Sequence, residues 1–169
     1  MAKPGKIGYA EAEAAVSLVK TWRGGLFIKW REERKIGEPE HAKARVPLSV
    51  NGVIQEGLFV DIYYKRSVIE GIPDKLSISL MFNNSRVFGL DENGPTRHLN
   101  KVGQGLEHFR QPVSTPHVHY PVPDGSYGYA EPIERLPIDK LWSLFCARAN
   151  ILNAPPFNLP ASDGQMDLL

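Results

Sequence analysis

The chain has 169 residues, 23% of them charged, and a formal net charge of +1. A chain of this length folds as one domain with a hydrophobic core. Its near-neutral net charge argues against sequence-independent binding to nucleic acid, although it does not exclude a local basic patch. The single cysteine, Cys146, excludes an internal disulfide. No apolar run is long enough to span a bilayer, and residues 1–6 lack the apolar core of a signal peptide, so we expect a cytoplasmic protein without membrane contact.

The first part of the chain predicts a helix, a short strand and a charged loop. Residues 9–22 carry alanine and valine at the spacing of a buried helical stripe, and the glycines that follow should end this helix. Residues 26–30 alternate large apolar side chains as a short strand does. Residues 31–43 mix both charges without apolar periodicity, which indicates a solvated loop; a basic arm that reaches a phosphate backbone is the functional alternative.

A hairpin is predicted next. Asn51-Gly52 separates residues 46–50 from residues 53–64, and this dipeptide readily adopts the positive φ that both turn residues of a tight hairpin need. Pro47 cannot donate a hydrogen bond to a neighbouring strand, so we expect the first strand of the hairpin at a sheet edge.

Residues 76–82 give the clearest strand signal. Large apolar residues alternate there with small or flexible ones, which predicts one face in the core and an opposite face that is only lightly covered. Residues 83–85 should turn the chain into a returning strand over residues 86–90, with Phe88 and Leu90 facing inward.

The second half predicts a long irregular segment, two strands and a closing helix. Residues 91–115 are rich in glycine and proline, and loops of this length in a compact domain are usually functional or disordered. Strands should follow over residues 117–122 and 127–131, separated by a Pro-Asp-Gly-Ser turn. Apolar residues at helical spacing predict a helix over residues 138–149.

The order of helix, antiparallel strands and helix is typical of an α+β domain. We therefore expect a curved antiparallel sheet of about six to seven strands, with one N-terminal and one C-terminal helix. Residues 1–152 should form this single domain. The prolines of residues 153–169 predict a tail that wanders or packs in extended form.

The side chains that can do chemistry gather in two neighbouring segments. His117 and His119 are two apart on a predicted strand and should project from the same face. Upstream, Arg97, His98 and Asn100 add a guanidinium, a third imidazole and an amide. Every functional interpretation depends on whether the irregular segment brings His98 to the later pair.

Two histidines can share proton removal and proton donation near neutral pH, because their unperturbed pKa is about 6.5. His98 and His119 are the predicted acid–base pair for cleavage of a phosphodiester, with His117 as the alternative partner. An RNA substrate supplies its own nucleophile, the 2′-hydroxyl, so this scheme needs no metal or other cofactor. The predicted substrate contacts, which share a position beside the histidines and could hold developing charge, are Arg97, Asn100, Tyr120 and Tyr127.

Two alternatives stay open for the same residues. His98, His117 and His119 could bind a divalent metal, since two ligands on a strand and one from a loop make a workable site. The structural alternative is that the imidazoles bond to backbone carbonyls of the long segment and that Asn100 closes an Asx-type turn.

Three segments carry a pattern, namely Arg97-His98-Leu99-Asn100, Pro116-His117-Val118-His119-Tyr120 and Tyr129-Ala130. With a closing helix after them, they resemble a group of small, uncharacterised bacterial and phage-borne proteins. The resemblance covers residues 76–151 and implies a mobile-element context, in which small nucleases, toxins and inhibitors of host defence are common. It carries no established activity, and the spacer over residues 101–115 is longer here than in that group.

Two functions from different classes follow. The first is a small His-dependent ribonuclease or nucleotide phosphodiesterase of bacterial or phage mobile-element type. The second is a non-catalytic binding protein for a nucleotide, a nucleic acid or a protein partner, for example a homodimeric phage inhibitor of a host defence system. The residues that would then contact phosphate or stack on bases are Arg97, His117, His119, Tyr127 and Arg135.

Overall fold

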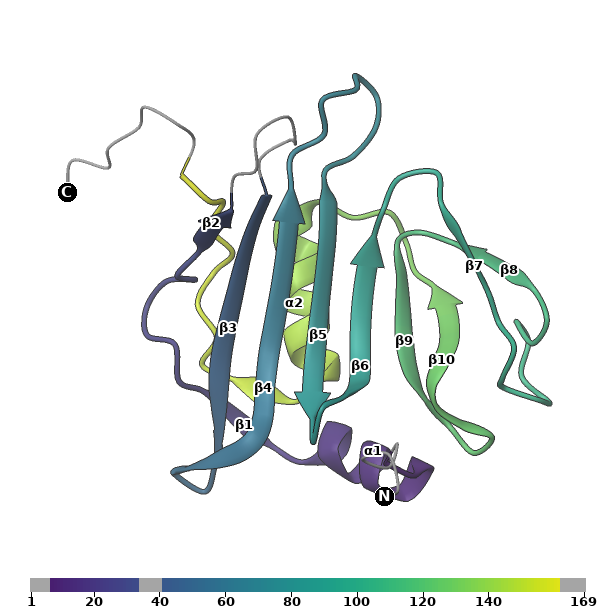
Figure 1. Cartoon of the computed structure of the whole chain (residues 1–169), viewed down its shortest axis with the longest axis horizontal. Coiled ribbons are helices and arrows are strands. Elements are labelled where there is room, and N and C mark those ends of the chain that lie inside the picture. The colour runs from purple at the N-terminus through teal and green to yellow at the C-terminus, as the bar shows by residue number, and fades with distance from the viewer. Residues whose placement is uncertain (1–6, 34–40, 162–169) are drawn as a thin grey trace.

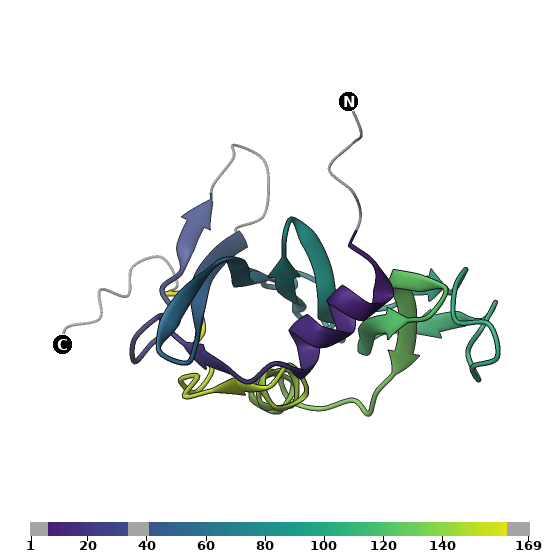
Figure 2. The same ribbon diagram turned by 90° about the horizontal axis from the view of Figure 1, so that it is seen from below.

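A strongly curved sheet forms the body of the molecule, with α2 packed against its inner face and α1 across one end (Figure 1, Figure 2). The structure is a computed structural model and describes residues 7–33 and 41–161. Its elements are α1 (Tyr9–Ser17), β1 (Lys20–Trp22), β2 (Arg31–Glu33), β3 (His41–Val50), β4 (Val53–Lys65), β5 (Lys75–Phe82), β6 (Ser85–Glu92), β7 (Arg97–Leu99), β8 (Pro112–Ser114), β9 (His117–Val122), β10 (Gly125–Pro132), α2 (Ile138–Arg148) and β11 (Ile151–Leu152).

The predicted α+β class is confirmed, but the sheet is larger than expected. Among the described residues it has nine strands instead of about six to seven, in the order β10-β9-β6-β5-β4-β3-β1-β11, with β2 paired to β3. The strand pairs of this sheet in the described part of the chain are antiparallel except β1 with β11, which run parallel. The undercount has a physical cause, because β1, β2 and β11 have two or three residues each and are too short for an alternation to show.

Strict alternation along the central strands separates a core face from an outer face. In β5 the leucines and the isoleucine are buried, whereas Ser77 and Ser79 lie on the outer face. The inner face is covered by α2, which buries Leu141, Trp142 and Phe145 against it. Each large apolar side chain that is fully buried contributes about 1.5–3 kcal/mol to folding, so this inner layer is the main source of stability.

Both predicted tight turns are confirmed. Asn51 and Gly52 have φ values of 50° and 78°, and Asn83 and Asn84 have values of 46° and 63°. Glycine and asparagine tolerate this left-handed region, which lets two antiparallel strands reverse without splaying. The elements β5 and α2 also match their predicted ranges to within one residue.

The expectation that Pro47 marks a sheet edge is wrong. Its strand, β3, pairs with β4 on one side and with β1 on the other. The register between β3 and β4 shifts between Pro47 and Ser49. On its other side β3 pairs with β2 over residues 41–43 and with β1 over residues 48–49, so Pro47 lies between these two ladders, where a strand needs no backbone donor.

The first helix is shorter than the predicted residues 9–22, because a buried lysine ends it. The ammonium of Lys20 donates to the carbonyls of Ala15, Val16 and Leu18, which lie at the C-terminal end of α1. Helix C-terminal carbonyls lack partners within the helix and carry partial negative charge, so a cation there satisfies both needs. Lys20 then continues into β1 rather than into another helical turn.

Residues 26–30 form no strand, contrary to expectation, and they bond to the C-terminal tail instead of to a neighbouring strand. The side chain of Asn158 bonds to both the N–H and the carbonyl of Ile28, and the carbonyl of Asn158 accepts from the indole of Trp30. The described part of the tail thus packs along the body in extended form.

The predicted loop over residues 31–43 is in part strand. It begins with β2 and ends within β3, and residues 34–40 lie outside the described residues. The long segment over residues 91–115 is likewise more regular than expected, since it begins as the end of β6 and contains a separate two-stranded ribbon made of β7 and β8.

Neither described helix is long and apolar enough to cross a membrane.

The buried cap of α1 gives a stability prediction. Replacing Lys20 by methionine keeps the bulk of a fully buried side chain but leaves three carbonyls without their donor, so we expect the free energy of unfolding to fall by about 2–3 kcal/mol in urea titrations. The matched control is Lys140→Met on the exposed side of α2, which should change it by less than about 0.5 kcal/mol. Equal effects of the two substitutions would contradict the capping role.

Candidate active site

The register between β6 and β9 places three polar side chains together on the outer face. Asp91 lies opposite His117, and Gly89 lies opposite His119. The intervening pair, Leu90 and Val118, is fully buried on the inner face. Because side chains alternate along a strand, the aspartate and both histidines must therefore face outward.

A β-bulge in β6 places the guanidinium of Arg86 on the same outer face. Leu80 pairs with Phe88 and Met81 pairs with Arg86, so Val87 is an extra residue on β6. Without it, Arg86 would share the inward face of Phe88; with it, the guanidinium turns to the outer face. Bulges next to functional sites often redirect a side chain in this way.

Gly89 gives that guanidinium its room. A Cβ atom at position 89 would lie 2.3 Å from Cζ of Arg86, which is closer than two non-bonded atoms approach each other. The Arg86 side chain therefore lies directly over the Gly89 backbone. The absence of a side chain at position 89 is thus a steric requirement of the site.

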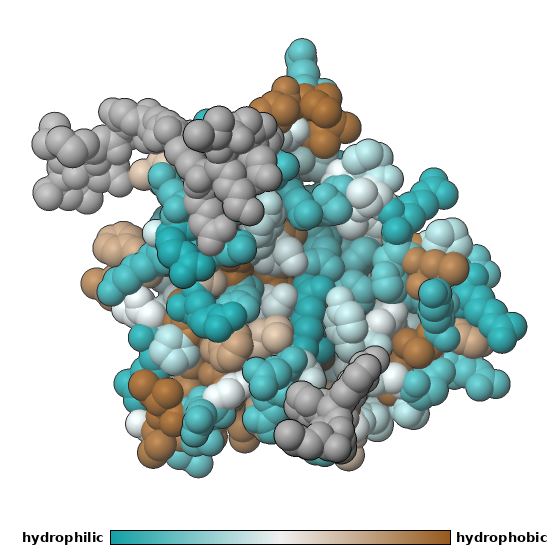
Figure 3. Space-filling model, viewed as in Figure 1, coloured by the Kyte–Doolittle hydropathy of each residue, from teal (hydrophilic) through white to brown (hydrophobic). Residues whose placement is uncertain are grey.

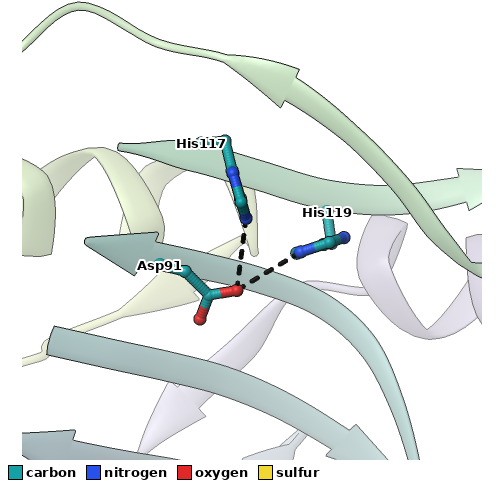
Figure 4. A group of neighbouring side chains, drawn as sticks. All are labelled: Asp91, His117 and His119. Atoms are coloured by element: carbon teal, nitrogen blue, oxygen red, sulfur yellow. Dashed lines mark ion pairs between the residues drawn. The ribbon is translucent and has the colours of Figure 1, made fainter. Parts of the chain in front are cut away.

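The carboxylate of Asp91 lies at the centre of the contacts in the site. Its carboxylate accepts from Nη2 and Nη1 of Arg86 at 2.8 and 3.1 Å and from the hydroxyl of Ser77 at 2.7 Å. Nε2 of His117 lies 3.5 Å and Nε2 of His119 lies 3.3 Å from its Oδ2 (Figure 4). Burial alone would raise the pKa of Asp91, but the hydrogen bonds from the two histidines and from Arg86 outweigh it and lower that pKa far below its usual range.

The three predicted imidazoles converge. Ring centroids lie 4.7 Å apart for His117 and His119, 4.8 Å for His98 and His119, and 5.9 Å for His98 and His117. His98 comes from the β7–β8 ribbon, and its Nε2 donates to the carbonyl of Gly128 in β10 at 2.7 Å. The irregular mid-chain segment therefore does fold back onto the later strand.

The structural alternative describes part of this arrangement. Nδ1 of His117 donates to the carbonyl of Ser114 at 3.1 Å, and His98 is bonded to a carbonyl as well. His119 differs, because its Nδ1 is buried without a hydrogen-bond partner. Buried polar atoms are nearly always paired, so Nδ1 of His119 is an unsatisfied acceptor on a residue that lines the hollow, and a ligand reaches it only when the side chains that cover it move.

His119 is held in its neutral form. Burial is the largest influence and lowers its pKa, and the nearby positive charges of Arg86 and His117 act in the same direction, while Asp91 opposes them. A neutral ring that donates from Nε2 to Asp91 leaves Nδ1 as a proton acceptor. This is the arrangement of a general base oriented by a carboxylate.

His117 differs from His119, because its Nε2 cannot donate to Asp91 while the ring is neutral. Since its Nδ1 donates to Ser114, Nε2 of a neutral ring would turn a lone pair toward Oδ2 of Asp91. Two acceptors at that distance need a proton or a cation between them. Ligand atoms of Asp91, His117 and His119 lie within 4.8 Å of one another, so these three residues, rather than the predicted set with His98, could hold a metal ion.

The site opens into a polar hollow of about 340 Å³. The exposed Arg97 and the half-buried Lys75 of β5 both line it. Tyr127 is 45% exposed, accepts from Arg86 at 3.1 Å and packs its ring 5.2 Å from that of His119. Of the predicted substrate contacts, Arg97 and Tyr127 thus lie at the hollow.

The other two predicted substrate contacts are not brought to the hollow. Asn100 is fully buried, where its amide donates to the carbonyls of His108 and Ala130 and accepts from the N–H of Ala130. Tyr120 lies on the opposite face of β9 from the histidines, against Tyr129 at a ring distance of 5.3 Å. Burial raises the pKa of Tyr120, which makes it a poor proton donor to solvent.

Sequence reasoning missed Asp91, Arg86 and Ser77 as parts of the site. A signal for Asp91 existed, because an inward Leu90 implies an outward neighbour on the same strand. The position of Arg86 had no such signal, since its outward direction depends on the bulge. Comparisons with family models, with curated proteins and with solved structures found no match, so the function has to be inferred from this geometry.

The lowered pKa of His119 predicts how stability depends on pH. Below about pH 6.5 the unfolded chain protonates this residue while the folded chain resists it, so the unfolded state binds more protons and the free energy of unfolding falls as the pH falls. Asp91 stays ionised through this window because its pKa is lowered. Urea titrations between about pH 7.5 and about pH 5 should show a weaker dependence for His119→Gln than for wild type. An unchanged slope in His119→Gln, compared with His108→Gln as the control, would contradict a lowered pKa.

Proposed function

We propose that the chain is a small His-dependent phosphodiesterase that cleaves RNA without a metal. The observation that supports this most directly is the convergence of three imidazoles in the lining of an open polar hollow, two of them beside the half-buried carboxylate of Asp91. The resemblance to mobile-element proteins agrees with such an activity, since small nucleases are common there.

In the proposed reaction His119 is the general base and His98 the general acid. Nδ1 of neutral His119 takes the proton of the 2′-hydroxyl, whose oxygen attacks the phosphorus. The bond to the 5′-oxygen breaks, and protonated His98 gives its Nδ1 proton to that leaving oxygen, so the products are a 2′,3′-cyclic phosphate and a 5′-hydroxyl. Asp91 orients His119 through Nε2 and stabilises the imidazolium that forms.

The surroundings of each ring suit its role. The carbonyl of Gly128 fixes the Nε2 proton of His98 and leaves its Nδ1 for the substrate. Arg97 and Lys75, which line the hollow, supply positive charge for the phosphate oxygens, whose charge grows in the transition state. Arg86 is a positioning residue, since both of its Nη groups are engaged by Asp91, Tyr127 and the carbonyl of Ile78, and its Nε is buried without a partner.

Substitution of the two acid–base residues tests this scheme. His98→Ala and His119→Ala should each lower kcat for a ribodinucleotide by at least about 100-fold, because each removes one proton-transfer partner, while the melting temperature stays within a few degrees. His108→Ala, outside the hollow, is the control and should keep full activity. Folded His98→Ala and His119→Ala variants with full activity would refute the scheme. Labelled RNA that wild type binds and that is recovered intact after denaturation would instead support the non-catalytic binding protein.

A second candidate is a metal-dependent hydrolase, favoured by the lone pair that neutral His117 would direct at Asp91. Asp91, His117 and His119 would bind one divalent transition metal, whose chemistry is to activate water for attack on the phosphorus. The two candidates make opposite predictions about the metal.

Elemental analysis and chelation distinguish them. A metal site predicts about one equivalent of bound metal in the purified protein, lost in Asp91→Ala and His117→Ala but kept in His98→Ala, which serves as the matched control. Treatment with a chelator should then abolish turnover. Full activity of metal-free protein would reject this candidate and support the metal-independent scheme.

A further inference from the structure

A second hollow, the loop hollow, lies further along β5 and β6 than the histidine hollow, and its volume is about 320 Å³. On the outer face, Ser77 of β5 pairs with Asp91 of β6. Two residues further along each strand, Lys75 and Asn93 line both hollows, as Thr96 does. Two residues along a strand span about 7 Å, so the loop hollow begins within the length of one nucleotide from Asp91.

Apolar side chains of the β4–β5 loop distinguish the loop hollow from the histidine hollow. Val68 is 82% exposed, Ile69 is 63% exposed and Ile72 is 36% exposed, and all three line it. Pro73 and Pro95 add two apolar rings. In Figure 3, hydrophobic side chains gather over this loop at the top of the molecule. Apolar side chains that gather in one hollow are typical of a surface that a ligand covers, because their contact with water is unfavourable.

Hydrogen bonds fix both walls of the loop hollow. In the β4–β5 loop, the carboxylate of Asp74 accepts from the N–H of Ser67 at 2.8 Å. In the turn between β6 and β7, the hydroxyl of Thr115 accepts from the N–H of Asn93 at 3.1 Å and donates to the carbonyl of Gly94 at 2.8 Å. Walls that are already fixed lose little conformational entropy when a ligand binds between them.

The two walls meet where Ile72 packs on the backbone of Gly94. A Cβ atom at position 94 would lie only 3.1 Å from Cγ2 of Ile72, and φ of Gly94 is 59°, which favours glycine. The turn that contains Gly94 leads directly into β7, which carries Arg97 and His98. The apolar wall is therefore held at a fixed place relative to the proposed general acid.

We propose that the loop hollow is a base subsite, in which one of the two bases next to the scissile phosphate lies against Val68, Ile69 and Ile72. This inference rests on the proposed function, because it places the base relative to a phosphate that reacts beside the histidines. The faces of a nucleobase are the least polar part of a nucleotide, so they gain most from leaving water against apolar side chains. The volume of the loop hollow lies near the lower end of the range of about 300–1,000 Å³ for ligand pockets, which suits a single ring system.

A matched pair of surface substitutions tests the subsite. Ile69→Ser removes an apolar contact from the loop hollow, whereas Ile54→Ser makes the same change at a position of β4 that is 58% exposed and does not line it. Ile69→Ser should lower kcat/KM for a ribodinucleotide by about fivefold. The change should appear in KM rather than in kcat, because the base is held equally in the ground state and in the transition state. Ile54→Ser should change neither quantity.

Dinucleotides that lack one base give the second readout, because a merely structural effect of Ile69→Ser would not depend on the substrate. The missing base is either 5′ or 3′ of the scissile phosphate. For one of these two substrates, wild type should lose at least about fivefold in kcat/KM, and Ile69→Ser should then cause no further loss, since the contact is already gone. Equal effects of Ile69→Ser on the complete and on both abasic dinucleotides, or no effect on any of them, would overturn the inference and leave the proposed function intact.

Binding of an uncleavable dinucleotide separates the subsite from catalysis. A 2′-O-methyl dinucleotide lacks the nucleophile, so an NMR titration measures its Kd alone. Ile69→Ser should raise this Kd by about fivefold, and Ile54→Ser should leave it unchanged. The same change in Kd without cleavage of any ribodinucleotide would overturn the proposed function and leave the subsite. An unchanged Kd in Ile69→Ser would overturn the subsite.

Discussion

The ion pair between Asp91 and Arg86 organises the outer face of the sheet. Taking two charges out of water is costly, and further hydrogen bonds offset part of that cost. Here Ser77, Tyr127 and the carbonyl of Ile78 provide them, while Nε of Arg86 stays buried without a partner. Arg86 binds both carboxylate oxygens, and Oδ2 also faces the two histidines of β9, so their orientation derives from the pair.

The pair in turn depends on two local features of β6. The extra residue at Val87 directs the guanidinium outward, and the bare backbone at Gly89 accommodates it. A similar irregularity occurs in β10, where the register shifts between Gly125 and Tyr129. Tyr127 and Gly128 lie within that shift and contact Arg86 and His98 respectively. The irregular pairing of β6 and β10 therefore supplies three contacts of the site, namely Arg86 with Asp91, Tyr127 with Arg86, and Gly128 with His98.

Much of the fold could be predicted from local patterns, for physical reasons that the structure makes clear. The alternation of β5 and the turn at Asn51-Gly52 are short-range properties, and both were predictable. The small outward residues Ser77 and Ser79 indicated a lightly covered face, and Ser77 lines the polar hollow of the site. The strands β1, β2 and β11 were not predictable, because partners distant in sequence, rather than their own two or three residues, make them strands.

The site could be predicted only in part. The shared face of His117 and His119 followed from their spacing, whereas the approach of His98 was an open expectation and the carboxylate beside the pair was not predicted. Asn100 shows the opposite error, because a polar residue beside histidines was interpreted as a substrate contact, whereas its amide fastens two backbone segments. Sequence alone cannot distinguish these roles, since both require a hydrogen-bonding side chain near the site.

The fastening by Asn100 has a consequence for how often the three rings are together. His98 belongs to the β7–β8 ribbon, which shares no backbone ladder with the main sheet in the described residues, whereas His117 and His119 belong to the main sheet. The ribbon is tied to β10 by side chains, chiefly Asn100 and His98 itself. Local unfolding of the ribbon alone would withdraw one imidazole while the sheet stays intact. The amide hydrogen exchange of the ribbon, rather than global stability, therefore reports the fraction of time for which the centre is complete.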